Sequence, residues 1–261
     1  MSKHPKHHYI PVFYLQQWAD TCGRLIEYSR QGPHNFVKAR PTSPTGTGYA
    51  RGLNLVPGAS PDVVEFVEKE FMRLVDEWAA RALVAFLSPD KEPSIRERIG
   101  WARFIYSLIL RTPEHIELIR KKSAEFNIAS PPQALLPRLI NSTTAIQNIS
   151  KMAWHVADFS TSASRFLTSD RPLIMTNGLA QDDSHLALPI SPTRIFLEVQ
   201  KHTMLESLKT LDAQLVSIAN TRIAEQAIKY VYGTDASQLY FIAKHLGKRI
   251  RATPLDEVVA G

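Results

Sequence analysis

The hydrophobic pattern of this chain changes its period near residue 154, and that change restricts the fold more than any other feature. Before it, apolar residues recur at helical spacing, which predicts a helix from Ser60-Pro61 to just before Pro89, a second from Ser94 and a third from Thr112-Pro113 to about residue 126. Residues 130–137 are typical of a connector and 138–152 of a further helix. From residue 154, short runs rich in β-forming residues follow at 154–159, 165–169, 185–190 and 194–200.

The ends of the chain complete this order. Residues 11–20 predict a short helix that buries aromatic side chains, and 23–30 with 35–40 predict a hairpin. Two more helices are expected over 212–232 and 235–246. Runs of strands and runs of helices that do not alternate indicate an α+β fold. We therefore predict one helix-rich domain over residues 1–261, in which a small mixed or antiparallel sheet joins the N-terminal hairpin to the later strands, with tails at 1–10 and 247–261.

Composition restricts the compartment and the function class. Cys22 is the only cysteine, so there is no intrachain disulfide and no cysteine-based zinc site. No apolar run approaches the roughly 20 residues that span a bilayer, and the N-terminus lacks the apolar core of a signal peptide, so we expect a cytoplasmic protein without a membrane partner. The net charge of +6 allows an anionic partner. The sequence carries no P-loop, dinucleotide-binding glycine motif, HExxH or GxSxG.

The most unusual stretch is KHPKHHYIPVFYLQQW, residues 3–18, with three histidines in five positions. His7 and His8 are adjacent, so on an extended backbone they point to opposite faces, and one imidazole can enter a site while the other does not. Chelation of one metal ion by both is awkward. The alternative is a basic terminus, or a histidine that caps the following helix. The aromatic residues, Tyr9 among them, can stack bases, although core packing explains most of them better.

Two later motifs hold polar residues in apolar surroundings. Ser169 and Asp170 follow a predicted strand, where Asp170 can act as a general base or hold a metal ion and Ser169 can act as a nucleophile. The alternative is an Asx or Ser turn ahead of Pro172. Arg111 ends an otherwise apolar helix. It can clamp a phosphate or carboxylate group, or it can complement the dipole at the helix C-terminus.

Three stretches together resemble a bacterial family of unknown function, also found in some fungi, that opens with an HHY-x-P-x-FYL motif. They are HHYIPVFYLQQWAD (7–20), LILRTPEH (108–115), and RFLTSDRPL with LPISPTR (165–173 and 188–194). The matching residues are His7, His8, Tyr9, Pro11, Phe13, Tyr14, Leu15, Arg111, Pro113, Thr168, Ser169, Asp170 and Pro172. The loop RPTSPTGTGYARGLNL departs from the family pattern, which expects an acidic and aromatic end. The resemblance implies no activity, because the family has none established.

We predict from these motifs a hydrolase that acts on a phosphate-bearing substrate such as nucleic acid; the family's general character suggests a role in bacterial defence. His7, His8, Asp170 and Ser169 are the candidate catalytic residues, and Arg111, Tyr9 and Arg171 the candidate substrate-binding residues. A divalent metal ion is an allowed cofactor. Two alternatives stay open: a non-catalytic binding module for an anionic ligand or nucleic acid, and a purely structural role in which the motifs specify turns, caps and core.

Overall fold

The computed structural model of the chain describes residues 4–53, 66–126, 132–176, 181–209 and 213–249. The chain forms two compact units, each assembled from separate segments. The first unit comprises residues 1–11 and 49–150, and the second comprises residues 12–48 and 151–261. Within the described ranges, helices long and apolar enough to cross a membrane are absent. The prediction of a single domain stays a prediction.

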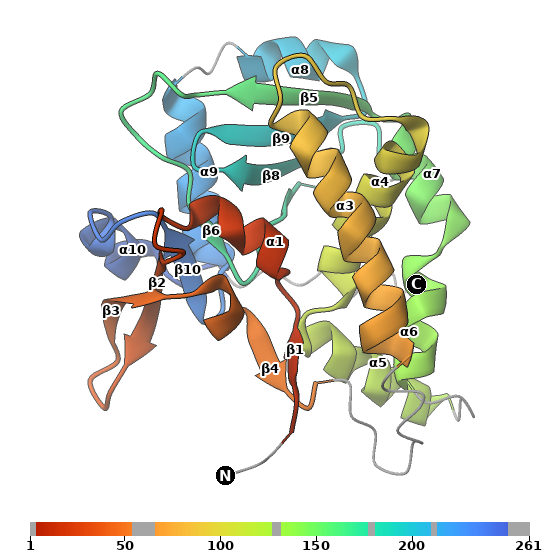
Figure 1. The fold of residues 1–261 in the computed structure, drawn as a ribbon, viewed down its shortest axis with the longest axis horizontal. Helices are drawn as coiled ribbons and strands as arrows, with labels where there is room; N and C mark the ends of the chain where they lie inside the picture. The colour runs from red at the N-terminus through yellow and green to blue at the C-terminus, as the bar shows by residue number, and fades with distance from the viewer. Residues whose placement is uncertain (1–3, 54–65, 127–131, 177–180, 210–212, 250–261) are drawn as a thin grey trace. The chain divides into compact units, whose positions relative to one another are not determined.

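The first unit is mainly helical, with one small two-stranded sheet (Figure 1). Its elements are β1 (Lys6–His8), β4 (Tyr49–Arg51), a π-helix (Phe66–Met72), α3 (Arg73–Phe86), α4 (Ile95–Leu110), α5 (Pro113–Glu125), α6 (Pro132–Ile140) and α7 (Thr143–Lys151). The strands β1 and β4 pair antiparallel, with His7 opposite Ala50 and His8 opposite Tyr49. Part of the predicted N-terminal tail is therefore an ordered strand.

Helix starts in this unit follow the caps that the sequence predicts. Ser94 begins α4 with a capping box, in which its hydroxyl accepts from the Glu97 amide and the Glu97 carboxylate accepts from the Ser94 amide. Thr112 caps α5, and Pro113 occupies its first turn. The helices α3 and α4 run alongside each other (Figure 1). They approach so closely at Gly100 that an added Cβ would lie 2.5 Å from the Trp78 Cβ.

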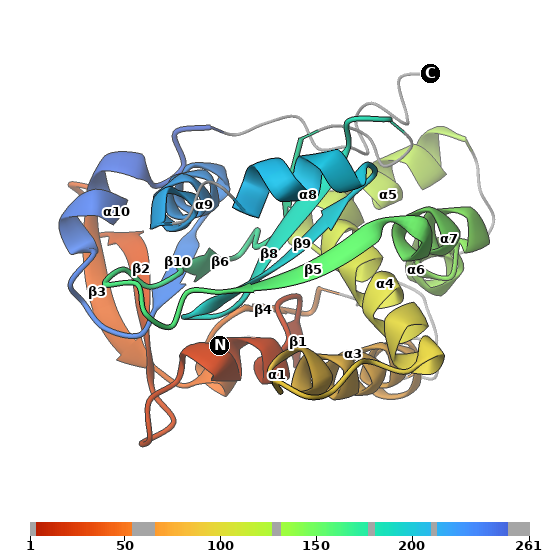
Figure 2. The ribbon, with the colours of Figure 1, turned by 90° about the horizontal axis from the view of Figure 1, so that it is seen from above.

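The second unit holds two antiparallel four-stranded sheets and most of the remaining helices (Figures 1 and 2). Its elements are α1 (Val12–Leu15), a 3-10 turn (Gln16–Trp18), β2 (Leu25–Gln31), β3 (Phe36–Thr42), a 3-10 turn (Pro44–Gly46), β5 (Ala153–Asp158), β6 (Thr168–Ser169), β7 (Ile174–Met175), β8 (His185–Ser191), β9 (Arg194–Val199), α8 (His202–Lys209), α9 (Ala213–Gln226), β10 (Tyr230–Gly233) and α10 (Leu239–His245). One sheet has the order β3-β2-β10-β6 and the other β5-β9-β8-β7.

The α+β fold class is confirmed. The predicted hairpin of β2 and β3 does share an antiparallel sheet with later strands, β10 and β6. The remaining late strands form a sheet of their own, however, because β8 and β9 form a hairpin that pairs with β5 on one side and β7 on the other. Two small sheets therefore replace the single predicted one.

Helix α9 contributes to two hydrophobic cores of the second unit. Its first half, with Val216 and Ala219, packs with α8 against the sheet of β8 and β9. Its second half, with Ile223 and Ala224, packs with α10 against the sheet of β2 and β10. Figure 2 shows α9, seen nearly end-on, between α8 and α10. One helix thus supports both sheets, which accounts for its apolar residues on more than one side.

Several predicted boundaries are wrong. Residues 132–140 form helix α6 instead of a connector, since Pro132 fits a first helical turn and Pro137 is accommodated inside it. The helix predicted over 138–152 is shorter in the structure, where α7 spans Thr143–Lys151. Helix α8 was not predicted from the sequence. The helix predicted over 212–232 ends at Gln226, because residues 230–233 form the β10 strand between β2 and β6. The predicted start at Ser60-Pro61 and the end of the basic tail lie outside the described residues.

Candidate functional site

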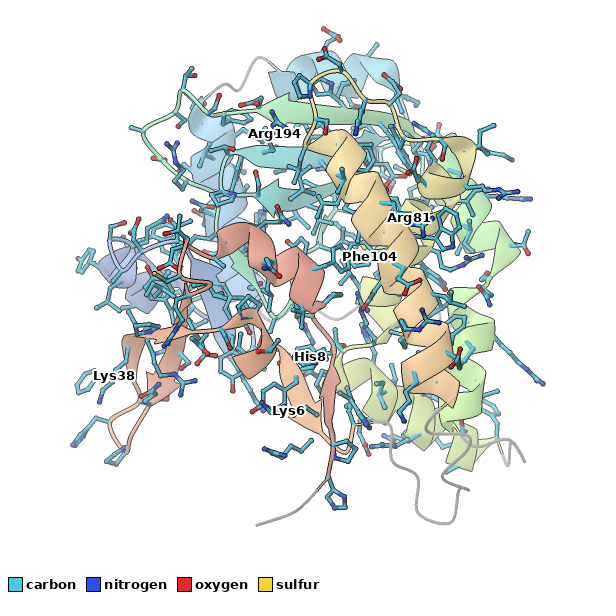
Figure 3. The ribbon with its side chains drawn as sticks, viewed as in Figure 1. Lys6, His8, Lys38, Arg81, Phe104 and Arg194 are labelled. Atoms are coloured by element: carbon cyan, nitrogen blue, oxygen red, sulfur yellow. The ribbon has the colours of Figure 1, made fainter. Side chains whose placement is uncertain are left out.

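The two adjacent histidines lie on β1 and point to opposite sides, as predicted. His7 is buried, with 4% of its surface exposed, whereas His8 is half-buried and contacts Tyr49 edge-on, with ring centroids 5.6 Å apart. Lys6 shares the His8 side, and its ammonium lies 4.3 Å from the centre of the Tyr49 ring (Figure 3). Burial lowers the pKa of His7, and repulsion from His8 lowers it further, so His7 favours the neutral imidazole.

Arg111 follows α4 as its C-terminal cap and belongs to the same unit. Only 2% of its surface is exposed. Its Nη1 donates to the Asp76 Oδ1 at 2.9 Å, and its guanidinium carbon lies 5.3 Å from the centre of the Phe104 ring. Among the described residues, the Nε and Nη2 atoms of Arg111 are buried without a hydrogen-bond partner. A buried guanidinium with two unsatisfied donors is energetically costly, which is characteristic of a group that receives a further anion or ordered water.

Asp76 bonds Arg111 and also feels the charge of His8. It lies near the start of α3, just after the π-helix, a distortion that is frequent at functional sites. Burial raises the pKa of its carboxyl, while Arg111 and, more weakly, the charge of His8 oppose that rise. The carboxylate is 28% exposed, so solvent reaches it. We call Arg111, Asp76 and His8 the arginine site.

Sequence reasoning missed Asp76. It is one of several acidic residues on a helix whose charges suggest an ordinary solvated face. The available signal was Arg111 itself, because a cation that becomes fully buried at the end of an apolar helix needs a carboxylate or other polar partner. Nothing in the sequence indicates which carboxylate that is.

Asp170 lies in the second unit and is used in a different way. Only 5% of its surface is exposed, and its two carboxylate oxygens accept from the backbone amides of Ile228, Lys229 and Tyr230 at 2.7–3.2 Å. Its own amide donates to the Tyr230 carbonyl. These bonds join the residue after β6 to the start of β10. The carboxylate bonds span 58–60 residues, so they are not those of the predicted Asx turn; they give Asp170 a structural role in joining two distant segments.

The residues beside Asp170, in contrast, make local turn contacts. The Ser169 hydroxyl donates to the Arg171 carbonyl at 2.9 Å and accepts from the Arg171 amide at 3.1 Å, as in a Ser turn. The Arg171 carbonyl also accepts from the Gln226 side chain. The catalytic roles predicted for Ser169 and Asp170 and the substrate-binding roles predicted for Arg171 and for Tyr9, which is buried just after β1, stay predictions.

Two aromatic residues of the opening motif, Tyr14 and Trp18, are fully buried in the second unit. The Tyr14 hydroxyl shares a hydrogen bond with the Thr168 hydroxyl at 2.8 Å and donates to the Pro189 carbonyl at 2.7 Å. The Trp18 indole donates to the Phe166 carbonyl at 2.8 Å. The FYL and TSD motifs therefore contact each other directly, and their contact holds α1 against β6 and β8.

The predicted site residues consequently fall into two groups. His7, His8 and Arg111 belong to the first unit, and Ser169, Asp170 and Arg171 belong to the second. Over the ranges that the structure describes, there is no cluster of three or more His, Cys, Asp or Glu side chains able to hold a metal ion. The arginine site is the part of the prediction in which the structure brings titratable groups together.

Comparison with known families agrees with the resemblance seen in the sequence. The model of a family described as Protein of unknown function (DUF4238) matches residues 6–136 and 131–237. These matches cover most of the chain, which therefore belongs to that family. No curated protein and no solved structure matches the chain.

Proposed function

We propose that the first unit binds a phosphate-bearing ligand at the arginine site. The observation that carries this proposal is the state of Arg111, which is almost fully buried and yet uses only one of its donor atoms in a hydrogen bond within the described residues. Two further donors, Nε and Nη2, suit the bidentate geometry of a phosphate or carboxylate group. Lys6 and His8 add positive character on one side of β1 in the same unit.

Asp76 has a defined role in such a site. Its carboxylate accepts a hydrogen bond from Nη1 of Arg111, which fixes the plane of the guanidinium group. The Nε and Nη2 donors of Arg111 are thereby held in one orientation. Asp76 and an arriving phosphate use different donor atoms of Arg111, but both are negative and so compete for its one positive charge. Protonation of Asp76, which burial favours, weakens this competition.

Hydrolysis of the bound phosphate ester is the second candidate, and the electrostatic influence of His8 on Asp76 favours it. In such a reaction an imidazole accepts a proton from water, and a carboxyl whose pKa is raised by burial, as that of Asp76 is, gives a proton to the leaving oxygen. This is the hydrolase predicted from the sequence, with Asp76 in the place first given to Asp170. The single cysteine supports a cytoplasmic location for either activity.

The binding proposal is tested by calorimetric titration with pyrophosphate of the wild type, Arg111→Met and Arg81→Met. Arg81 is an exposed arginine of α3 in the same unit that stacks on Trp78, so Arg81→Met removes the same charge without touching the arginine site (Figure 3). We expect Arg111→Met to weaken binding at least tenfold and Arg81→Met to leave it within about twofold, since one charge-assisted pair contributes about 1.5–3 kcal/mol. Equal affinity of the wild type and Arg111→Met would contradict the proposal.

The second candidate has its own test. His8→Gln is assayed for hydrolysis of a chromogenic phosphodiester and for pyrophosphate affinity. Loss of turnover with retained affinity supports catalysis, whereas parallel loss of both leaves only the binding module. A wild type that binds pyrophosphate but hydrolyses no phosphate ester would remove the hydrolase and keep the first proposal.

A further inference from the structure

The sheet β3-β2-β10-β6 of the second unit has one face that helices cover and one that they leave partly open. Helices α9 and α10 pack on the first face, against Tyr28, Val231 and the partly buried Val37 and Ala39. Residues directly opposite each other across paired strands share a face, so the strand register assigns the other face. It carries Phe36, Lys38 and Arg40 of β3, Gln31, Ser29 and Glu27 of β2, and Tyr230 and Tyr232 of β10.

The part of this second face around Glu27 and Tyr232 is covered by other residues of the same unit. The Thr47 hydroxyl bonds both Glu27 and the Tyr232 hydroxyl, and Tyr14 bonds Thr168 of β6. Glu27 and Tyr232 are accordingly buried. The opposite end, at the free edge of β3, is exposed. We call Gln31, Phe36, Lys38 and Tyr230 the open sheet face.

The open sheet face combines aromatic rings with a cation. Phe36 is 69% exposed, and its ring contacts the ring of His34 in a tilted arrangement with centroids 5.9 Å apart. Tyr230 is partly exposed and stacks on Tyr232 at 6.2 Å, which holds its ring in place. Exposed Lys38 lies two residues from Phe36 on β3 and in the same cross-strand row as Tyr230, and it points away from the ribbon (Figure 3).

The charge of this face is positive. Glu27 is the only acidic residue that the strand register places on it among β2, β3 and β10, and Arg40 neutralises it at 2.8 Å. The Arg40 side chain remains 56% exposed, and Lys38 is left uncompensated within this register. An exposed aromatic ring beside an exposed lysine suits a ligand with flat apolar rings joined by negative groups.

We propose that the open sheet face binds single-stranded nucleic acid, with bases stacked on Phe36 and Tyr230 and a backbone phosphate at Lys38. Stacking on aromatic rings of a sheet together with cations that follow the backbone is a general way of binding a single strand without reading its sequence. A duplex does not fit this surface, because its bases are not free to stack. This inference goes beyond the phosphate site of the first unit and does not depend on it.

The test is fluorescence anisotropy with labelled twenty-nucleotide strands of poly-dT and poly-U and a duplex of the same length. Phe36→Ala and Lys38→Gln probe the open sheet face. Tyr240→Ala and Lys244→Gln are the matched controls, because both lie on α10, which packs against the other face, and Tyr240 is 85% exposed. None of these changes removes a buried side chain, so all four variants should fold. The two strands distinguish DNA from RNA.

We expect the wild type to bind at least one single strand more tightly than the duplex. Phe36→Ala should weaken that binding about tenfold, as one lost base stack does, and Lys38→Gln should weaken it and reduce the slope of log affinity against log salt by about 0.7. The α10 variants should stay within about twofold. Absence of single-strand binding, or equal losses in the α10 variants, would overturn the inference. Because Arg111→Met is expected to leave strand binding unchanged, its result separates this inference from the phosphate site.

Discussion

Arg111 and Asp170 are both charged and almost fully buried, but the two units satisfy their charges in opposite ways. Asp170 accepts from three backbone amides, and the described contacts account for both of its oxygens. Arg111 donates to one carboxylate oxygen and keeps two buried donors without a partner among the described residues. The hydrogen bonds of Asp170 lie within the second unit, whereas two donors of Arg111 have no partner among the residues that the structure describes.

This difference teaches that a short polar motif beside a proline does not by itself indicate chemistry. Both motifs follow an element of secondary structure and precede Pro113 or Pro172. What distinguishes them is the balance of donors and acceptors around the charge, which depends on the tertiary structure. The comparison therefore predicts that Asp170 matters most for stability and that Arg111 matters most for binding.

The largest effect is expected for Asp170→Ala. It leaves three backbone amides of residues 228–230 without their acceptor at the start of β10, so the free energy of unfolding should fall by about 3 kcal/mol or more. Urea denaturation measures it, with Asp182→Ala as the control because the Asp182 side chain is 89% exposed. A loss below about 1 kcal/mol would remove the structural interpretation of Asp170.

Tyr14→Phe should have an intermediate effect. The variant keeps the buried ring but loses the hydrogen bonds to Thr168 and to the Pro189 carbonyl, which should cost about 1–2 kcal/mol. Thermal and urea unfolding measure the loss. The double variant with Thr168→Val tests whether the two motifs are coupled, since their losses should then be less than additive. Full additivity would mean that the contact of FYL with TSD contributes nothing of its own.

Arg111→Met should cost less than either of these changes, about 1 kcal/mol or less. Removing the buried cation also removes two unsatisfied donors, and methionine fills part of the space beside Phe104. The partly exposed Asp76 can return to water. Urea denaturation of Arg111→Met beside Asp170→Ala compares the two units directly. If Arg111→Met is as damaging as Asp170→Ala, Arg111 is a structural residue and the comparison fails.

The smallest effect is a pH dependence that comes from His7. Burial lowers its pKa in the folded chain, so the unfolded chain takes up the proton first as the pH falls below about 6.5. The contribution of His7 to stability is therefore complete above that pH and declines below it. Between pH 7 and pH 5, the free energy of unfolding of the wild type should fall more steeply than that of His7→Gln. Parallel curves would show that His7 titrates normally.

Local patterns predicted the elements of this fold better than their pairing. The caps at Ser94 and Thr112 and the β2–β3 hairpin are determined by neighbouring residues and were predictable. The strand at 230–233 was not, because its place between β2 and β6 depends on segments far away in the chain. For the site, the faces of His7 and His8 followed from a strand period of two. Arg111 and Asp76 are 35 residues apart in the sequence, and their pairing has no local signal.

The most direct test of the central claim observes Arg111 itself. In protein labelled with ¹⁵N at arginine, the Nε signal that disappears in Arg111→Met is assigned to this residue and followed during titration with pyrophosphate. We predict a saturable change of that signal, larger than the change at Arg81, because the buried Nε gains an acceptor that the described fold does not provide. A signal from Arg111 that stays constant while pyrophosphate binds would show that its spare donors receive no anion and would contradict the account.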